Sequence, residues 1–301
     1  MGTVLACGLT VLDVIQTVDH VPAPDEKLVA SDLLVAAGGP AANAAVTAAA
    51  LGATARLVTR AGRSVVGRLV AEDLAAHGVD VVDLAGPEES PAVSTVLVSR
   101  GTGHRAVVSV NATRAAPAPP DDVTARDLVV GADVVLVDGH HLDLAVPVAR
   151  AARAAGVPVL LDGGSWKPGL QALLAHVDVA VLSADLVVPA ELAGHLSDQL
   201  AAVASLGPRV VGRSHGPGPV ELRTPAGRTE IPVPAVTVLD TLGAGDVLHG
   251  ALAVWFAEHG VADPAAGLAW AARAAAASCE APGARGWLSG PEPGRLRAGL
   301  L

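Results

Sequence analysis

The sequence predicts an α/β fold with a mostly parallel sheet, because short β-branched runs alternate with amphipathic stretches from about residue 56 onward. The runs ARLVTRAG, ADVVLVDG and VPVLLDGG are followed by VVGRLVAEDLAAHG, LAVPVARAARAAG and LQALLAHV. A helix that returns the chain to the same sheet makes neighbouring strands parallel, and helices then cover both faces. With 301 residues, 51% of them hydrophobic, the chain can bury a substantial core, and we expect a single domain over residues 1–301.

Two segments depart from this alternation and predict a small additional β-sheet. One spans about residues 15–37, and the other spans about 92–111, where STVLVSR and RAVVSVN flank the stretch Gly101–His104. We expect the second segment to form a hairpin, and the two segments together to form a lid over a cleft of the main domain. The stretch Pro117–Pro120 is expected to link the hairpin to the later βα units.

The loops that follow the predicted strands are the first place to look for a ligand site, because parallel sheets bind ligands at the carboxyl ends of their strands. These loops carry small, hydroxylated and acidic residues that could contact a polar ligand. They are Gly8, Gly62, Asp138, Asp162, Ser183 and Ser214.

The charge and the cysteine content argue against several classes of function. The formal net charge is -10 and no basic run is present, so a nucleic-acid-binding surface is not expected. Cys7 and Cys279 fit reduced structural thiols better than a disulfide or a metal site, which favours a cytoplasmic protein. The uncharged stretch 33–55 is long enough to span a bilayer, but its glycines, proline and asparagine favour a buried loop and helix, and no membrane partner is expected.

The stretch DTLGAGDVLHG at residues 240–250 is the most informative motif in the chain. Gly243 and Gly245 allow a tight turn, and the apolar spacing of the following residues predicts a helix. The free N–H groups and the positive dipole end of such a helix can hold a phosphate or the charge that develops during phosphoryl transfer. Asp246 could take a proton from a hydroxyl directed at that phosphate. The alternative is that Asp246 only caps a glycine-rich helix start.

A second motif, GGPAAN at residues 38–43, precedes an alanine-rich helix that is expected to stop at Gly52. The amide of Asn43 can both donate to and accept from hydroxyl groups. Asp13 follows the first predicted strand by a few residues, where its carboxylate could bind a sugar diol. Each feature alone also fits a structural role, with the glycines serving close helix packing and Asp13 lying in a surface turn.

Taken together and in this order, GGPAAN followed by ALGA, and DTLGAGD followed by a helix, resemble the two signature regions of the ribokinase-like (PfkB) carbohydrate kinases. The similarity runs through nearly the whole chain. It includes the first strand with Asp13, the segment ALGATARLVTRAGRSVVGRLVAEDLAAHGVDV, the interposed hairpin and the C-terminal ALAWAARAAAASCEAPGARG. The resemblance implies a Rossmann-like main domain, a β-sheet lid, ATP as the phosphoryl donor and usually a requirement for Mg2+.

The resemblance also implies roles for residues at matching positions. Asp246 would be the base that activates the acceptor hydroxyl, and an anion hole would be formed by the backbone amides of Gly243, Ala244 and Gly245. The residues that would bind sugar hydroxyls are Asp13, Gly39 and Asn43. The residues on the nucleotide side would be Ser183, Arg213, Ser214, Gly216, Thr241, Gly243, Gly245, Cys279 and Gly283.

The chain departs from the family pattern in two places. Many members carry an Asn-x-x-Glu element that organises the magnesium ion, but VLSADLVVP places Ser183 and Leu186 at these positions, which leaves the metal ligands unknown. The family's Thr-x-Gly nucleotide strand end reads VGRSHG here, and Arg213 could compensate as a phosphate ligand. Ser183, the stretch DGGSWKPG near Asp162 and the histidine in GAGDVLHGA are similar to the ketohexokinase-like branch, so a ketohexose or a related sugar is the leading acceptor.

The far end of the acceptor should face the lid and the strand-end loops. The candidate residues there are Lys27, Arg105, Asn111 and His140. If Lys27 and Arg105 converge with Asn111, they could bind a phosphate or sulfonate on the sugar; otherwise both cations are solvated. The stretch Asp138–His141 is not predicted to hold a metal, because adjacent histidines point apart on an extended chain.

The sequence is also compatible with several other functions. Within the same family, the alternatives are a sugar-acid kinase and a nucleoside kinase, although a nucleoside would favour stacking aromatic residues, which make up only 2% of the chain. From another class, the alternative is a catalytically weak sugar or nucleotide sensor, motivated by the altered magnesium element and nucleotide strand. A homodimer formed through the lid is open by analogy with similar proteins.

Overall fold

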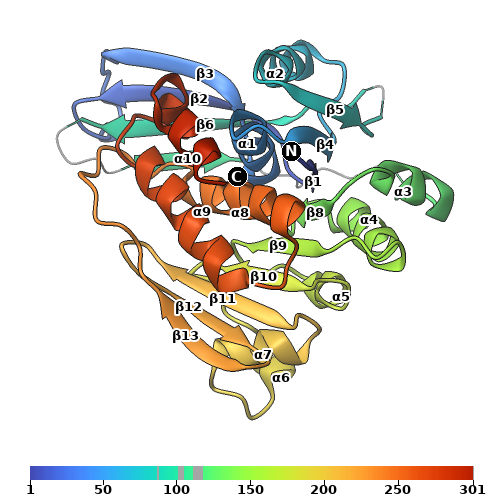
Figure 1. The fold of residues 1–301 in the computed structure, drawn as a ribbon. Coiled ribbons are helices and arrows are strands. Elements are labelled where there is room, and N and C mark those ends of the chain that lie inside the picture. The colour runs from blue at the N-terminus through green and yellow to red at the C-terminus, as the bar shows by residue number, and fades with distance from the viewer. Residues whose placement is uncertain (87, 101–104, 111–117, 301) are drawn as a thin grey trace.

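The computed structural model describes residues 1–86, 88–100, 105–110 and 118–300. Within these residues, the main feature is a nine-stranded sheet with the order β13-β12-β11-β10-β9-β8-β1-β4-β5 (Figure 1). The strands from β11 to β5 run parallel, and β12 and β13 add an antiparallel edge. The strands are β1 (Thr3–Cys7), β4 (Thr54–Thr59), β5 (Val79–Asp83), β8 (Val134–Val137), β9 (Val159–Gly163), β10 (Val179–Leu182), β11 (Val210–His215), β12 (Gly218–Thr224) and β13 (Gly227–Ile231).

Helices cover both faces of this sheet (Figure 1). One face packs against α1 (Pro40–Ala50), α2 (Val65–Ala76), α8 (Ala244–His259), α9 (Pro264–Ser278) and α10 (Glu292–Ala298). The other packs against α3 (Asp122–Val129), α4 (Leu142–Ala154), α5 (Leu170–Leu174), α6 (Ala190–Ala193) and α7 (Gln199–Ser205). The predicted α/β architecture is therefore confirmed. Among the described helices, none combines the length and apolar character needed to cross a membrane.

The strand β1 shows why the sheet is buried on both sides. Val4 and Ala6 enter the core beneath α1 and α8, whereas Leu5 and Cys7 enter the core beneath α4. Successive side chains of a strand point to opposite faces, so a continuous apolar run can fill both layers. The carboxyl ends of the parallel strands are thereby held in a rigid row.

A second, four-stranded sheet has the order β3-β2-β6-β7. The pairs β2–β3 and β6–β7 are antiparallel, and β2 and β6 are parallel. The expected small sheet and hairpin pairing are confirmed, although the first segment begins earlier than about residue 15. Residues 101–104 of the predicted turn and Asn111 lie outside the described residues. The strands are β2 (Val11–Val18), β3 (Asp32–Gly38), β6 (Ala92–Ser99) and β7 (Arg105–Ser109).

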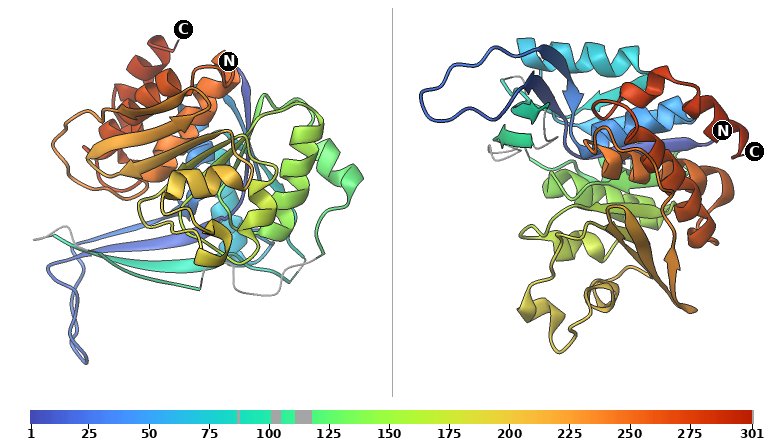
Figure 2. Two further views of the ribbon diagram at one scale, coloured as in Figure 1. Left: turned by 90° about the horizontal axis from the view of Figure 1, so that it is seen from below. Right: turned by 90° about the vertical axis from the view of Figure 1, so that its left-hand side faces the viewer.

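The second sheet extends away from the helices that cover the large sheet, and the loop between β2 and β3 projects farthest (Figure 2). It joins the rest of the chain at the GGPAAN motif, because β3 ends at Gly38 and α1 begins at Pro40. In β3, the residues near this junction are buried and those toward the loop are exposed. In β2, Val11 and Leu12 near the junction are buried, the middle of the strand is partly buried, and Val18 at the loop end is buried again. The inner end of the second sheet is therefore fixed beside the first motif.

Candidate active site

The N-terminus of α8 is formed by the DTLGAGD motif. Gly243 is the N-cap residue in a left-handed conformation with φ 76° and ψ 4°, and no described side chain caps the helix. A Cβ atom at Gly243 would lie 2.4 Å from the Cβ of Ala284, so this position requires glycine for space as well as for its backbone angle. At Gly245, no described atom outside its own helix neighbourhood lies within 4 Å of where a Cβ would stand. The turn therefore presents backbone N–H groups without a side-chain cap beside open space at Gly245, and Ala244 N donates only a long hydrogen bond of 3.3 Å to Thr241 O.

The two signature motifs meet at a hydrogen bond between their polar side chains. Asn43 Nδ2 donates to Asp246 Oδ2 at 2.8 Å, although the residues are 203 positions apart in the sequence. The helices α1 and α8 can approach this closely because Gly250 has no side chain: a Cβ there would lie 2.5 Å from the carbonyl oxygen of Ala44. Asp246 is thus turned toward the first motif and is not a cap of its own helix.

The environment of Asp246 raises the pKa of its carboxyl group to about 7. Burial is the largest cause, and the negative charges of Asp162 and Asp138 act in the same direction. The hydrogen bond from Asn43 and the proximity of His249 oppose the increase in pKa. A carboxylate with a pKa near neutrality is suited to accept a proton from an alcohol during reaction.

Asp138 connects the ends of several elements. This buried carboxylate accepts hydrogen bonds from the backbone N–H groups of Leu9 at 2.8 Å, Ala41 at 3.1 Å and His140 at 2.9 Å. Gly8 makes room for it, since a Cβ there would lie 2.1 Å from Asp138 Oδ1. Asp138 therefore fixes the first turn of α1 to the carboxyl ends of β1 and β8. The sequence predicted that this residue lies in a strand-end loop, but it did not indicate which backbone N–H groups the carboxylate would bind.

His249 and Asp162 form a second buried polar group next to Asp246. His249 Nδ1 lies 2.7 Å from Gly245 O and 3.3 Å from Asp162 Oδ2, and His249 Nε2 lies 3.0 Å from Val181 O. Burial raises the pKa of Asp162, and the proximity of His249 opposes that increase. The sequence indicated Asp162 as a strand-end residue, and it indicated His249 only through the similarity of its motif to one branch of the family.

The residues predicted to bind sugar hydroxyls gather around the GGPAAN motif. Gly39 has φ 99°, and a Cβ there would lie 2.4 Å from Leu9 O, so only glycine fits. Asp13 lies within strand β2, in register with Ala36 and Ser94, and not in the surface turn considered as an alternative. Its Oδ2 lies 1.8 Å from the position of a Cβ at Gly38, so that glycine leaves room for the carboxylate.

Asp13 is also electrostatically perturbed. Burial raises the pKa of its carboxyl group, while a hydrogen bond with Ser94 and the proximity of Arg285 oppose that increase. Arg285 itself donates to Asp73 and to the carbonyl oxygen of Ala37, where β3 ends. The loop after α9 is thereby joined to the inner end of the second sheet, a link that the sequence did not suggest.

The residues predicted for the far end of the acceptor have separate environments. Lys27 is exposed in the loop between β2 and β3. Arg105, the first residue of β7, donates from Nη1 to Thr241 Oγ1 at 3.5 Å and so contacts the DTLGAGD motif itself. His140 is partly buried, and burial lowers the pKa of its imidazole, with nearby Lys167 acting in the same direction. Asn111 lies outside the described residues.

The positions that correspond to Asn-x-x-Glu do not fit a magnesium site. Ser183 Oγ accepts a hydrogen bond from Asp185 N at 3.2 Å, and Leu186 is buried in the core on the α5 and α7 face. A hydrocarbon side chain packed in the core supplies no oxygen ligand to a hard cation. We therefore assign no metal-binding role to Ser183 or Leu186.

The end of β11 turns sharply into β12. Arg213 donates to the carbonyl oxygen of Ala184, and Ser214 Oγ donates to Leu182 O at 3.3 Å, so both side chains contact the end of β10. Gly216 has φ 59° and lies in the turn between the antiparallel strands. This hairpin was not expected from the sequence.

The C-terminal loop contacts the start of the DTLGAGD motif. Asp240 Oδ2 accepts a hydrogen bond from Gly283 N at 2.8 Å, and Asp240 N donates to Cys279 O at 3.2 Å. Burial raises the pKa of the Cys279 thiol, which disfavours a reactive thiolate. Cys279 and Gly283 thus lie beside the start of the motif, next to Thr241 in sequence.

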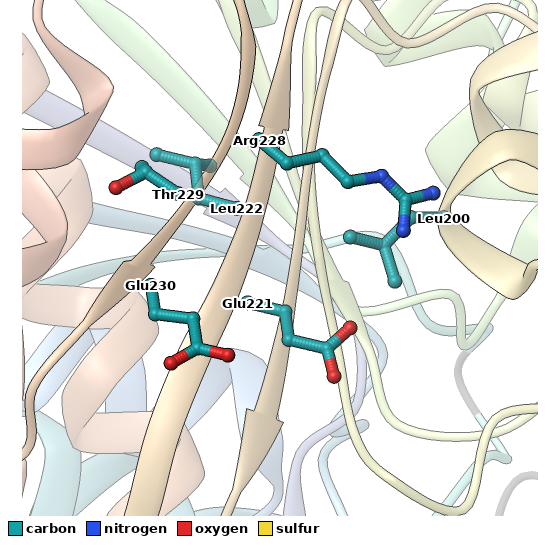
Figure 3. A pocket seen from close by; sticks show the side chains of 6 residues that line it. All are labelled: Leu200, Glu221, Leu222, Arg228, Thr229 and Glu230. Carbon is teal, nitrogen blue, oxygen red and sulfur yellow. The ribbon is translucent and has the colours of Figure 1, made fainter.

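A separate pocket of about 370 Å3 lies between α7 and the β12–β13 hairpin (Figure 3). None of the residues predicted for the site lines it. Arg228 lines the pocket and forms an ion pair with Asp198. Glu221 Oε1 lies 3.3 Å from His215 Nε2. The lining residues are Leu200, Glu221, Leu222, Arg228, Thr229 and Glu230.

The chain is similar to known proteins over most of its length. Residues 1–289 match the family model described as "pfkB family carbohydrate kinase". An ATP-dependent ribose-1-phosphate kinase from Halopiger xanaduensis is 31% identical over 265 residues, which cover 87% of each chain. A ribokinase from Bacillus subtilis is 27% identical over 297 residues, covering 95% of this chain and 96% of the relative.

A solved structure shares the fold over the full length. The structure of Arabidopsis thaliana ribokinase complexed with ribose and ATP superposes with a TM-score of 0.77 at 25% identity, covering 100% of this chain and 99% of that chain. The chain belongs to the PfkB family of carbohydrate kinases. It is therefore a phosphotransferase with an alcohol group as acceptor.

Proposed function

We propose that this protein transfers the γ-phosphoryl group of ATP to a hydroxyl group of a sugar, with Asp246 as the general base. The proposal is carried by the convergence of Asp246, Asn43 and the uncapped N-terminus of α8. The sugar hydroxyl gives its proton to Asp246, its oxygen bonds to the γ-phosphorus, and the bond from that phosphorus to the departing ADP oxygen breaks. The amides of Gly243, Ala244 and Gly245 stabilise the negative charge on the transferring group.

A pentose furanose is the first candidate for the acceptor, because the relatives named above are a ribokinase and a ribose-1-phosphate kinase. A ketohexose is the second candidate, and it is favoured by the similarity of Ser183 and His249 to the ketohexokinase-like branch. In either sugar, Asp13, Gly39 and Asn43 are the proposed contacts to the hydroxyl groups. A ring flanked by these contacts would direct its free hydroxymethyl group toward Asp246.

A negatively charged acceptor is favoured by Lys167. This lysine is partly buried after β9, and its charge acts on both Asp162 and His140. Its Nζ lies 3.3 Å from Ser165 Oγ, and no carboxylate of the described residues lies within ion-pair distance of it. A cation of this kind can receive the phosphate of a sugar phosphate or the carboxylate of a sugar acid.

The donor is proposed to be ATP with Mg2+. Thr241, Ser214, Gly216, Arg213, Cys279 and Gly283 are the proposed nucleotide-side residues. Because Leu186 is apolar and buried, the magnesium ion would be held mainly by nucleotide phosphates and water. Chelation of divalent cations is expected to abolish turnover while leaving the folded protein intact, which circular dichroism can verify.

We propose that the second sheet acts as a lid. Arg105 of β7 contacts Thr241, and Leu34 of β3 lies 3.8 Å from where a Cβ of Gly283 would stand, so the sheet reaches both parts of the nucleotide side. On one face, the sheet exposes the apolar residues Leu33, Val35 and Val108. A second copy of the chain is the proposed partner for this surface, and light scattering would show a dimeric mass.

The decisive experiment measures ADP release with ATP and a panel of ribose, ribose 1-phosphate, fructose, aldohexoses, sugar acids and nucleosides. Turnover with one of the sugars, lost in Asp246→Asn, is the expected result. Turnover with a nucleoside or a sugar acid alone would redirect the acceptor assignment. No ADP release across the panel, accompanied by an increase in Tm on addition of ligand, would indicate a sensor and overturn the proposal.

A further inference from the structure

The imidazole of His249 has hydrogen-bond partners on both of its nitrogens. Nδ1 lies 2.7 Å from Gly245 O, and Nε2 lies 3.0 Å from Val181 O, while the side chain is only 5% exposed. Both partners are backbone carbonyl oxygens, which accept hydrogen bonds and cannot donate them. A neutral imidazole has one N–H group and can satisfy only one of these carbonyls, whereas the imidazolium ion has two.

Asp162 supplies the negative charge that a buried imidazolium ion requires. Its Oδ2 lies 3.3 Å from His249 Nδ1, and its side chain is also buried at the end of β9. Burying an unpaired charge is costly, whereas a hydrogen-bonded pair of opposite charges is tolerated. The distances and the acceptors therefore favour a buried ion pair.

We infer that His249 is held as an imidazolium ion paired with Asp162, and that this pair positions the peptide between Gly245 and Asp246 and controls the charge of the general base. His249 and Asp162 are positioning residues, since both act through Gly245 and Asp246. The inference concerns the site of the proposed kinase reaction and rests on that proposed function for its catalytic consequence.

The first consequence concerns geometry. His249 Nδ1–H binds the carbonyl oxygen of the Gly245–Asp246 peptide, whose N–H belongs to the first turn of α8. A donor at the carbonyl oxygen strengthens the N–H of the same peptide as a donor. His249 Nε2–H binds Val181 O in β10, so the start of α8 is held to the carboxyl end of the large sheet.

The second consequence concerns the charge on Asp246. The positive charge of His249 lowers the pKa of Asp246, and the negative charges of Asp162 and Asp138 raise it. The loss of His249 leaves the negative charges of Asp162 and Asp138 without this opposing positive charge near Asp246. The charged groups that act on Asp162 itself are His249, Asp138, His140 and Lys167.

Nitrogen-15 NMR of the free protein tests the protonation state directly. The chain has 10 histidines. The ring signals of His249 are identified because they disappear in His249→Gln, and through-bond correlations connect them to the backbone signals of the same residue. We expect both ring nitrogens to carry a proton in the native protein, and one proton to be lost in Asp162→Asn. A single ring N–H in the native protein would overturn the inference, and because no substrate is used, that outcome is independent of kinase activity.

The pH dependence of kcat/KM tests the catalytic part. In His249→Gln, the rise of kcat/KM with pH is expected to move upward by roughly 1 pH unit, because Asp246 loses a neighbouring positive charge. His259→Gln is the matched control, since it makes the same change at the exposed end of the same helix. A native midpoint in His249→Gln would show that the histidine is a neutral cross-link. If this variant does not fold, the NMR measurement on the native protein still decides the inference.

Discussion

The large sheet and the second sheet use similar β-branched and aliphatic residues, but they differ in what covers them. Strands such as β8 and β10 are buried along their whole length between two layers of helices. In the second sheet, Leu33 is 60% exposed and Val108 is 74% exposed. The buried sheet fixes the groups whose relative positions matter most, including Asp138, Asp162 and the contact of His249 with β10. The exposed sheet contributes Asp13 beside the GGPAAN motif and Arg105 beside Thr241 of the DTLGAGD motif. The effects of substitutions on activity and stability should therefore differ between the two sheets, both in the quantity that changes and in the size of the change.

The largest effect is expected at Asp246, which is held by the helices on the large sheet. Asp246→Asn should lower kcat by roughly 10²- to 10⁴-fold, because the general base is lost while ligand contacts remain. The Tm should not fall, since the change removes a buried charge. Asp80→Asn, on the exposed side of β5, is the control and should retain full activity. Near-native turnover in Asp246→Asn would reject this residue as the base.

The second prediction concerns pH. The pKa of Asp246 in the folded protein is raised to about 7, so the carboxyl group is protonated and inactive as a base at lower pH. Consequently kcat/KM should rise as the pH increases through about 7 and then level off. A steady-state pH profile of the free enzyme measures this midpoint, and a flat profile across neutral pH would contradict the assignment.

The contact between the two motifs should have the next largest effect. Asn43→Leu removes the hydrogen bond to Asp246 and should lower kcat/KM by about 10- to 100-fold, the equivalent of one charge-assisted hydrogen bond. The pH midpoint should also move upward, because that hydrogen bond lowers the pKa of Asp246. Loss of activity without a change in the midpoint would mean that Asn43 acts only on the sugar.

At Asp138, the expected effect is on stability. Asp138→Ala removes the acceptor for the backbone N–H groups of Leu9, Ala41 and His140, and it should lower the free energy of unfolding by about 3 kcal/mol. Denaturant unfolding measures the loss. Asp185→Ala, at an exposed loop position, provides the comparison and should be nearly neutral.

The smallest effect is expected in the second sheet. Arg105→Ala removes an exposed contact of 3.5 Å to Thr241 and should raise KM by only a few-fold, with kcat little changed. Arg100→Ala, at the exposed residue that follows β6, is the matched control. A large fall in kcat for Arg105→Ala would show that the second sheet takes part in the chemical step, and the contrast between the two sheets would then be weaker.

Much of the fold could be predicted from local patterns. The alternation of strand and helix periods indicated the parallel sheet, and the breaks in that alternation indicated the second sheet, although β2 begins before the expected boundary. The antiparallel strands β12 and β13 were not expected, because the motif at residues 211–216 in β11 was interpreted only as a strand end. The glycines at 243 and 245 marked the start of α8, since their conformational freedom is a local property.

The sequence by itself determined the elements, the helix N-terminus with its acidic residue, and the chemical character of the motifs, because these depend on neighbours along the chain. Only the tertiary structure decided which groups meet: Asn43 with Asp246, Asp138 with three backbone amides, and His249 with two carbonyl oxygens. It also decided that Leu186 is buried and that Asp13 belongs to a strand. These outcomes depend on the close packing of α1 against α8 at Gly250, and a contact between residues 203 positions apart leaves no pattern in a local stretch of sequence.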